Sequence, residues 1–142
     1  MKKALKFIAY LLLGLLIAYA VARYAFLKMA ASSCGNTVIT EATSPAKRLK
    51  AVVFQRDCGA TTGFSTQVSI FSATDSLPEE AGNTFTSDTD HGAAPTSPAD
   101  GPEVSIEWEG ANSLLIRHHP KARVFTKQSA VDGVRVRYEH AQ

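Results

Sequence analysis

The stretch LKAVVFQRDCGATTGFSTQVSIF, residues 49–71, contains two segments in which apolar and polar residues alternate on either side of a loop of small residues. In the first segment, residues 49–57, Leu49, Ala51 and Val53 fall on one face. The second segment, residues 64–71, places on one face Phe64, Thr66, Val68 and Ile70. Because such alternation is typical of half-buried antiparallel strands, and glycines mark turns, the stretch predicts two neighbouring strands joined by the loop GATTG.

The same alternation recurs before and after this stretch. Its clearest example is EVSIEWE, residues 103–109, in which Val104, Ile106 and Trp108 alternate with polar residues. Further strands are predicted at residues 37–42, 83–86, 113–118, 122–126 and 134–138. The predicted fold is mainly β: an N-terminal transmembrane helix followed by a small antiparallel β-meander or sandwich of about six to eight strands.

One long segment, residues 73–102, interrupts the alternation. It contains four of the six prolines of the chain and no lysine or arginine. Long loops inside compact domains are either functional or disordered. We therefore expect a long polar loop within the β domain, at residues 73–102.

The first 33 residues differ in composition from the rest of the chain. They carry five lysines or arginines and no acid, and residues 7–22 contain no charge. A basic segment before an apolar run is the signature of a secretory signal or a signal anchor. As a helix, residues 4–29 would be about 39 Å long, enough to span a hydrocarbon core of about 30 Å. The sequence therefore predicts a membrane anchor formed by residues 4–29.

Two other interpretations of this segment stay open. Residues 18–20, Ala-Tyr-Ala, resemble a signal-peptide cleavage site, and residues 31–34, Ala-Ser-Ser-Cys, resemble a lipoprotein box. In all three cases the N-terminal lysines favour a cytoplasmic N-terminus and an exported remainder. The predicted organisation is thus a membrane anchor or signal segment at residues 1–33 and an extracytoplasmic β domain at residues 34–142. The protein would be single-pass, with its C-terminal domain in the periplasm.

The chain contains two cysteines, Cys34 and Cys58. In an oxidising compartment an even number of cysteines predicts a disulfide, and closing a loop of about 25 residues would stabilise the domain by about 3 kcal/mol. A catalytic Cys58 would need an activating neighbour, but the adjacent Arg56 and Asp57 carry opposite charges. We therefore expect a structural disulfide between Cys34 and Cys58.

The charges are segregated along the exported part. Residues 75–109 contain nine acids and no base, whereas residues 113–142 contain six bases and two acids. One interpretation is that acidic and basic strands pair across the sheet. The other is a basic face that docks a partner or anionic headgroups, and its candidate binding residues are Arg117, Lys121, Arg123, Arg135 and Arg137. Since residues 34–142 carry ten bases against thirteen acids, nucleic-acid binding is not expected.

No residue pattern predicts catalysis, a metal site or a cofactor. The hydroxyl-rich residues 61–66 lack the G-x-S-x-G pattern of serine hydrolases, and hydroxyls in a turn usually bond to the local backbone. His118 and His119 are adjacent in a predicted strand, so their side chains would point to opposite faces. Residues 88–90, Asp-Thr-Asp, lack the glycine and the distal glutamate of an EF-hand loop.

Four segments carry a resemblance to known proteins: RDCGATTGFSTQVSI at residues 56–70, GNTF at 82–85, HGAAP at 91–95, and PKARVF with DGVRVRYE near the C-terminus. They resemble a family of small exported bacterial proteins with no assigned activity, over most of residues 34–139. The resemblance implies export and nothing about chemistry. The strand rhythm of residues 44–116 also resembles one β-propeller blade, but no repeat is present that would close a ring.

The function predicted from these features is that of a membrane-anchored extracytoplasmic β domain. It would act as a non-catalytic binding module of the bacterial envelope, attached to the inner membrane and engaging an envelope protein. The alternative is a small envelope enzyme or metal-binding factor that uses the loop at residues 56–66 together with His91.

Overall fold

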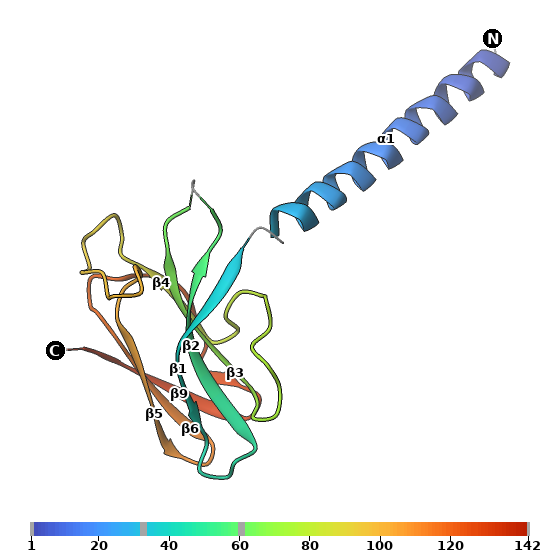
Figure 1. Cartoon of the computed structure of the whole chain (residues 1–142). Coiled ribbons are helices and arrows are strands. Elements are labelled where there is room, and N and C mark those ends of the chain that lie inside the picture. The colour runs from blue at the N-terminus through green and yellow to red at the C-terminus, as the bar shows by residue number, and fades with distance from the viewer. Residues whose placement is uncertain (1, 32–33, 60–61, 142) are drawn as a thin grey trace. The chain divides into compact units, whose positions relative to one another are not determined.

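The computed structural model describes residues 2–31, 34–59 and 62–141 of the 142-residue chain. The chain divides into two compact units, Met1–Ser33 and Cys34–Gln142 (Figure 1). The elements are α1 (Lys2–Ala31), β1 (Gly35–Thr43), β2 (Leu49–Asp57), β3 (Ser65–Ser72), β4 (Phe85–Asp88), β5 (Val104–Gly110), β6 (Ser113–His118), β7 (Arg123–Lys127), β8 (Ala130–Val131) and β9 (Val134–His140).

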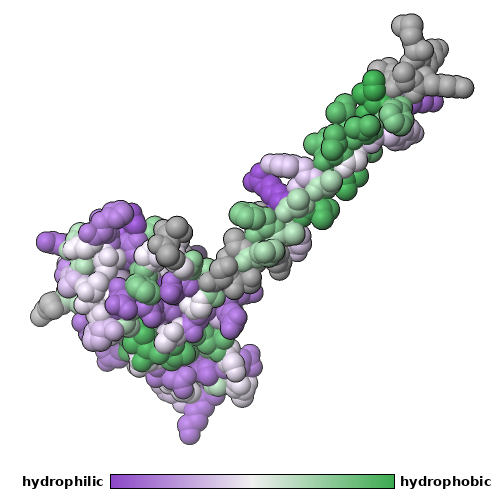
Figure 2. Space-filling model, turned by 45° about the horizontal axis from the view of Figure 1, so that its top comes forward, coloured by the Kyte–Doolittle hydropathy of each residue, from purple (hydrophilic) through white to green (hydrophobic). Residues whose placement is uncertain are grey.

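The helix α1 is apolar on every side over most of its length. Its large apolar side chains, from Phe7 to Phe26, are exposed, and Figure 2 shows them along the visible face of the helix. The 21-residue stretch Lys6–Phe26 is long and apolar enough to cross a membrane, and at 1.5 Å per residue it measures about 32 Å. A signal sequence shares this length and composition, so these properties of α1 fit a membrane anchor and a signal helix equally.

The second unit is a sandwich of two sheets (Figure 1). The five-stranded sheet has the order β1-β2-β3-β4-β7, and the four-stranded sheet has the order β5-β6-β9-β8. Strands β1, β2 and β3 follow one another as an antiparallel meander. The mainly β class, the N-terminal apolar helix and the sandwich architecture are therefore confirmed.

The core lies between the two sheets. Residues of alternating positions in both sheets fill it: Ala51, Val53, Val68, Ile70, Phe85, Val104, Leu114, Ile116, Val134 and Val136. Ile106 and Trp108 are partly buried against this core, as the alternation of residues 103–109 predicts. The Nε1 atom of Trp108 donates a hydrogen bond of 2.9 Å to the carbonyl oxygen of Ala42, which joins β5 to β1 at one edge of the sandwich.

Two features of the strand arrangement differ from the prediction. The structure has nine strands among the described residues, because a two-residue strand, β8, pairs with β9. The four-stranded sheet is also not wholly antiparallel, since β6 and β9 run parallel. The physical reason is that the chain leaves β6, forms β7 in the opposite sheet and then returns beside β6 in the same direction.

The outer face of the five-stranded sheet is more buried than alternation predicts. Val52 and Phe54 point away from the core, yet Phe54 is 0% exposed. The segment between β3 and β4 lies over this face, because the Gly82 amide bonds to Gln67 Oε1 at 2.6 Å and the Asn83 amide bonds to Ser69 Oγ at 3.2 Å. The first half of the long polar loop is therefore an ordered cover for the sheet.

The prediction for the apolar face of residues 64–71 was wrong at one end. Thr66, Val68 and Ile70 are buried, but Phe64 is 39% exposed. Phe64 precedes β3, which begins at Ser65. It therefore lies beyond the part of the strand that the opposite sheet covers.

Candidate functional site

The five predicted binding residues do not share one face. Arg117 lies on β6, and Arg135 and Arg137 lie on β9, all in the four-stranded sheet. Arg123 lies on β7 in the other sheet, and Lys121 lies in the connection between β6 and β7. The predicted basic face is thus split, because the chain changes sheets between β6 and β7. A binding role for each residue stays a prediction.

Two of these arginines take part in a network of ion pairs on the outer face of the four-stranded sheet. Arg117 contacts Glu107 at 2.8 Å and Glu139 at 3.2 Å, and Arg137 contacts Glu109 and Glu139 at 2.5 Å each. The hydrogen bonds from Arg137 lower the pKa of both Glu109 and Glu139. The acidic and basic strands therefore neutralise each other across the sheet, which is the first of the two interpretations drawn from the sequence.

The network lies over an outward-pointing leucine. Leu115 on β6 is directly opposite Glu107 on β5 and Arg137 on β9, and it is 1% exposed. The methylene groups of long charged side chains commonly cover apolar surface in this way. Arg135 and Lys121, in contrast, make no ion pair with any described residue and remain exposed.

A different site emerges on the outer face of the five-stranded sheet. One residue from each strand lies in register across it: Asn36, Arg56, Ser65, Asp88 and Arg123. Beside this row is a cleft of about 440 Å³. It is lined by Arg56, Cys58, Thr62, Gly63, Ser65, Gln67, Thr86, Asp88, His91, Arg123 and Phe125. The fold thus brings the loop at residues 56–66 together with His91, the two parts of the alternative site.

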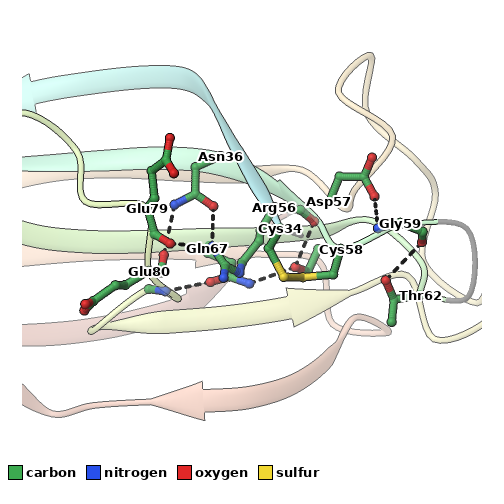
Figure 3. The surroundings of a disulfide bond; sticks show 12 residues. Cys34, Asn36, Arg56, Asp57, Cys58, Gly59, Thr62, Gln67, Glu79 and Glu80 are labelled. Carbon is green, nitrogen blue, oxygen red and sulfur yellow. Dashed lines mark hydrogen bonds between the residues drawn. A yellow bond between two sulfur atoms is a disulfide. The ribbon is translucent and has the colours of Figure 1, made fainter. Parts of the chain in front are cut away.

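Arg56 is the most unusual residue of this cleft. Only 9% of its surface is exposed, and its Nη1 atom donates to Asn36 Oδ1 at 2.7 Å and to the Glu79 carbonyl oxygen at 3.4 Å. Figure 3 shows the carboxylates of Glu79 and Glu80 pointing away from the guanidinium. No carboxylate of the described residues forms an ion pair with Arg56. Arg56 is therefore a nearly buried cation held by neutral oxygens.

The second arginine of the cleft is fully paired. Arg123 donates from Nη2 to Asp88 Oδ2 at 2.5 Å and from Nε to Asp88 Oδ1 at 3.2 Å, and its Nη1 lies 3.7 Å from Asp90. Burial favours the neutral acid at Asp88, but the hydrogen bond and the charge of Arg123 outweigh it and lower the pKa of Asp88. Among the arginines and carboxylates that line the cleft, Arg56 and Arg123 thus face one acid, Asp88, while Asp90 pairs with Arg123 from outside the lining.

His91 reaches the cleft from a left-handed turn. Asp90, His91 and Gly92 have φ values of 48°, 57° and 91°, and a hydrogen bond of 3.1 Å from the Ala93 amide to the Asp90 carbonyl oxygen closes the turn. Residues other than glycine rarely adopt a positive φ, and those that do cluster at functional sites. The turn is the second half of the long loop, so this part of residues 73–102 contributes directly to the cleft.

The disulfide lies at the end of the cleft. Cys34 and Cys58 are bonded, as predicted, and their Cα atoms are 3.9 Å apart, closer than the usual range of about 4.4 to 6.8 Å (Figure 3). Cys34 directly precedes Gly35 at the start of β1, Cys58 directly follows Asp57 at the end of β2, and Gly35 and Asp57 are paired. The Asp57 carboxylate accepts a hydrogen bond of 2.8 Å from the Gly59 amide, and Gly59 has a φ of 93°. Ala60 and Thr61, in the middle of the predicted GATTG turn, lie outside the described residues.

The remaining candidates are weaker. A groove of about 570 Å³ lies beside Val38 and Ile39 of the edge strand β1 and is closed on its other side by residues 97–104. Across residues 2–31, 34–59 and 62–141, no three His, Cys, Asp or Glu side chains are grouped as a metal site would require. Asp88 and Asp90, considered above for calcium, both face Arg123.

Sequence reasoning did not single out Arg56, although a signal was present. Arg56 continues the face of β2 that carries Val52 and Phe54, so an arginine extends an apolar row. Only the cover formed by residues 73–83 makes it an interior face and Arg56 a buried cation.

Comparison with known proteins identifies no relative. No family model, no curated protein and no solved structure matches the chain. The resemblance of residues 56–70 to a family of exported bacterial proteins therefore stays a prediction.

Proposed function

We propose that the chain is a membrane-anchored extracytoplasmic domain of the bacterial envelope that binds another envelope component and carries no catalysis of its own. The lysines at the N-terminus, the apolar helix α1 and the disulfide support this location. The anchor would be residues 4–29 in the inner membrane, and the β domain would lie in the periplasm.

The observation that carries the binding role is Arg56 in the cleft of the five-stranded sheet. A buried cation without an anionic partner is costly, and proteins retain such groups mainly where they serve a ligand or a specific structure. The cleft is also lined by the hydroxyls of Thr62 and Ser65 and by the imidazole of His91. Beside these polar groups lies the exposed apolar ring of Phe125. A small number of convergent polar groups beside an apolar one is typical of a binding site.

Photo-crosslinking from inside the cleft tests this function. A benzoylphenylalanine replaces Phe125, which is 59% exposed, in the full-length chain expressed in cells. Light should produce a discrete adduct in the membrane fraction. Benzoylphenylalanine in place of Ser105, which is exposed on β5 of the other sheet, is the matched control and should produce no adduct. Equal adducts from both positions, or none from the cleft, would contradict the proposal.

The alternative function, a small envelope enzyme or metal-binding factor, is supported by the meeting of the loop with His91 in one cleft. In this case the imidazole of His91 would act as a general base in the enzyme or as a metal ligand in the metal-binding factor. His91 is exposed, so His91→Ala should leave folding intact. A binding module should keep its adduct in this variant, whereas loss of a cellular phenotype in a folded His91→Ala protein would favour the enzyme.

A further inference from the structure

We propose that the Arg56 guanidinium anchors one oxyanion group of the ligand, a carboxylate or a phosphate. The inference rests on the proposed binding function of the cleft and names the chemistry that it recognises. It follows from the unused donors of Arg56, from the way the side chain is held, and from the charges around it.

Arg56 has hydrogen-bond donors that no described residue uses. A guanidinium has five N–H groups, and among the described residues only those on Nη1 of Arg56 have partners. Among the residues that the structure describes, the side-chain atoms that are fully enclosed without a partner are Ser87 Oγ and His118 Nε2. Nε and Nη2 of Arg56 are not among them, so neither donor is fully enclosed, and Arg56 lines the cleft. These two donors present the two parallel N–H groups that bind a carboxylate or phosphate in a bidentate manner.

The side chain is also held in place before any ligand arrives. Asn36 accepts from Arg56 through Oδ1, and its Nδ2 donates to the carbonyl oxygens of Pro78 and Glu80 at 2.9 Å each (Figure 3). The guanidinium is thus clamped between β1 and the segment that covers the sheet. A guanidinium that is already ordered loses little conformational entropy when a ligand binds, which favours affinity.

The surrounding charges favour an anion over a cation. Among the arginines and carboxylates that line the cleft, Arg56 and Arg123 outnumber Asp88, so the lining carries one net positive charge; Asp90, the second carboxylate on Arg123, does not line it. Ser65 lies directly opposite Arg56 on the neighbouring strand and lines the same cleft. Its hydroxyl donates to the Arg56 carbonyl oxygen at 3.4 Å and accepts from Gln67 Nε2 at 2.8 Å, so the guanidinium is the donor that the proposal rests on. A purely structural Arg56 would instead hold residues 78–80 against the sheet and bind no anion.

The test is a titration of the full-length chain in a neutral detergent, followed by NMR of backbone amides and arginine Nε–H groups. Potassium phosphate and potassium acetate are compared with potassium chloride at equal ionic strength. We expect saturable shifts at the Arg56 Nε–H signal and at Ser65 with phosphate or acetate, and none with chloride. The oxyanion with the lower midpoint identifies the group. Equal effects of all three salts, or shifts centred on Arg135 and Lys121, would overturn the inference.

Arg56→Lys keeps the charge but removes the two parallel N–H groups, so anion affinity should fall about tenfold, while Arg48→Lys, at an exposed arginine between β1 and β2, should change nothing. Unchanged affinity in Arg56→Lys would overturn the inference. If this variant does not fold, Asn36→Ala replaces it. Asn36→Ala frees the guanidinium from its partner on β1 but keeps the arginine, so it should weaken anion binding by a smaller factor. Affinity equal to that of the native chain in Asn36→Ala would then overturn the inference.

The two proposals fail separately. An adduct from position 125 without anion binding would refute the oxyanion anchor and leave the binding module intact. Anion binding without an adduct would retain the anchor and refute the capture of an envelope component.

Discussion

Gly82 lies against the backbone of Val68 so closely that a Cβ atom on it would stand 2.9 Å from the Val68 carbonyl oxygen. A Cβ would also lie 3.0 Å from the Phe85 carbonyl oxygen. Gly82→Ala must therefore push the covering segment off the five-stranded sheet. We expect a loss of about 1 to 3 kcal/mol in the free energy of unfolding, measured by urea denaturation of the full-length chain and followed by the fluorescence of Trp108, the single tryptophan.

Gly110→Ala is the matched control for this prediction. No atom lies within 4 Å of a Cβ built on Gly110, and its φ is outside the left-handed region. The substitution should therefore change stability by less than about 1 kcal/mol. If both alanine variants behave alike, the close approach of Gly82 to β3 is not a constraint.

Removal of the disulfide should weaken the domain without changing its fold. The double variant Cys34→Ala, Cys58→Ala frees a loop of 24 positions, and the chain-entropy model gives a loss of about 3 kcal/mol. The same urea titration measures it, with the reduced native chain as a comparison that should show a similar loss. An unchanged midpoint in both would mean that the bond does not stabilise the β domain.

The two ends of the apolar face of residues 64–71 should respond differently to truncation. Ile70 is 0% exposed in the core, so Ile70→Ala should cost about 2 to 5 kcal/mol. Phe64 is 39% exposed, so Phe64→Ala should cost much less. A larger loss at Phe64 than at Ile70 would contradict the exposure of Phe64.

Acid should destabilise the domain through His118. This histidine is 4% exposed beside Phe85, and burial, together with Lys127 and His140, lowers its pKa. Below a pH of about 6.5 the unfolded chain binds a proton there that the folded chain does not, so stability falls as the pH decreases. The decrease between pH 7.5 and 5 should be smaller in His118→Leu than in the native chain. Parallel pH profiles of the two proteins would contradict this assignment.

The membrane prediction is tested by fractionation. A reporter that is active only in the periplasm, fused after residue 142, should give signal, and the protein should stay with membranes after a high-salt wash. Retention should depend on α1, because its stretch Lys6–Phe26 has the length and composition of a span. Release into the soluble fraction would favour cleavage near Ala20 over a retained anchor.

Local patterns determined the elements of this protein. The uncharged residues 7–22 are enough to predict a helix, because no charged side chain interrupts them. The alternation of Val104, Ile106 and Trp108 is enough to predict a strand with one face on a core, as observed in β5. Two cysteines behind a predicted export segment are enough to predict their bond. Each of these properties depends on neighbours in the sequence or on composition.

The candidate site was less accessible to such reasoning. The sequence suggested His91 and residues 56–66 as an alternative site, and the fold brings them into one cleft. It gave no reason to place Arg123 with them rather than with Arg117, since both follow the same acidic segment. The difference arises because β7 pairs with β4 in the five-stranded sheet.

The tertiary structure alone decided which segments far apart in the chain contact one another. Arg56 becomes a buried cation because Glu79 and Asn36, at separations of 23 and 20 residues, close over it. Arg117 and Arg137 are neutralised because β5, β6 and β9 become neighbours. Alternation records that a face is covered or exposed on average, but it contains no information on which segment covers it. That choice depends on packing and pairing energies summed over the whole domain, which is why the cleft followed from the fold and not from the sequence.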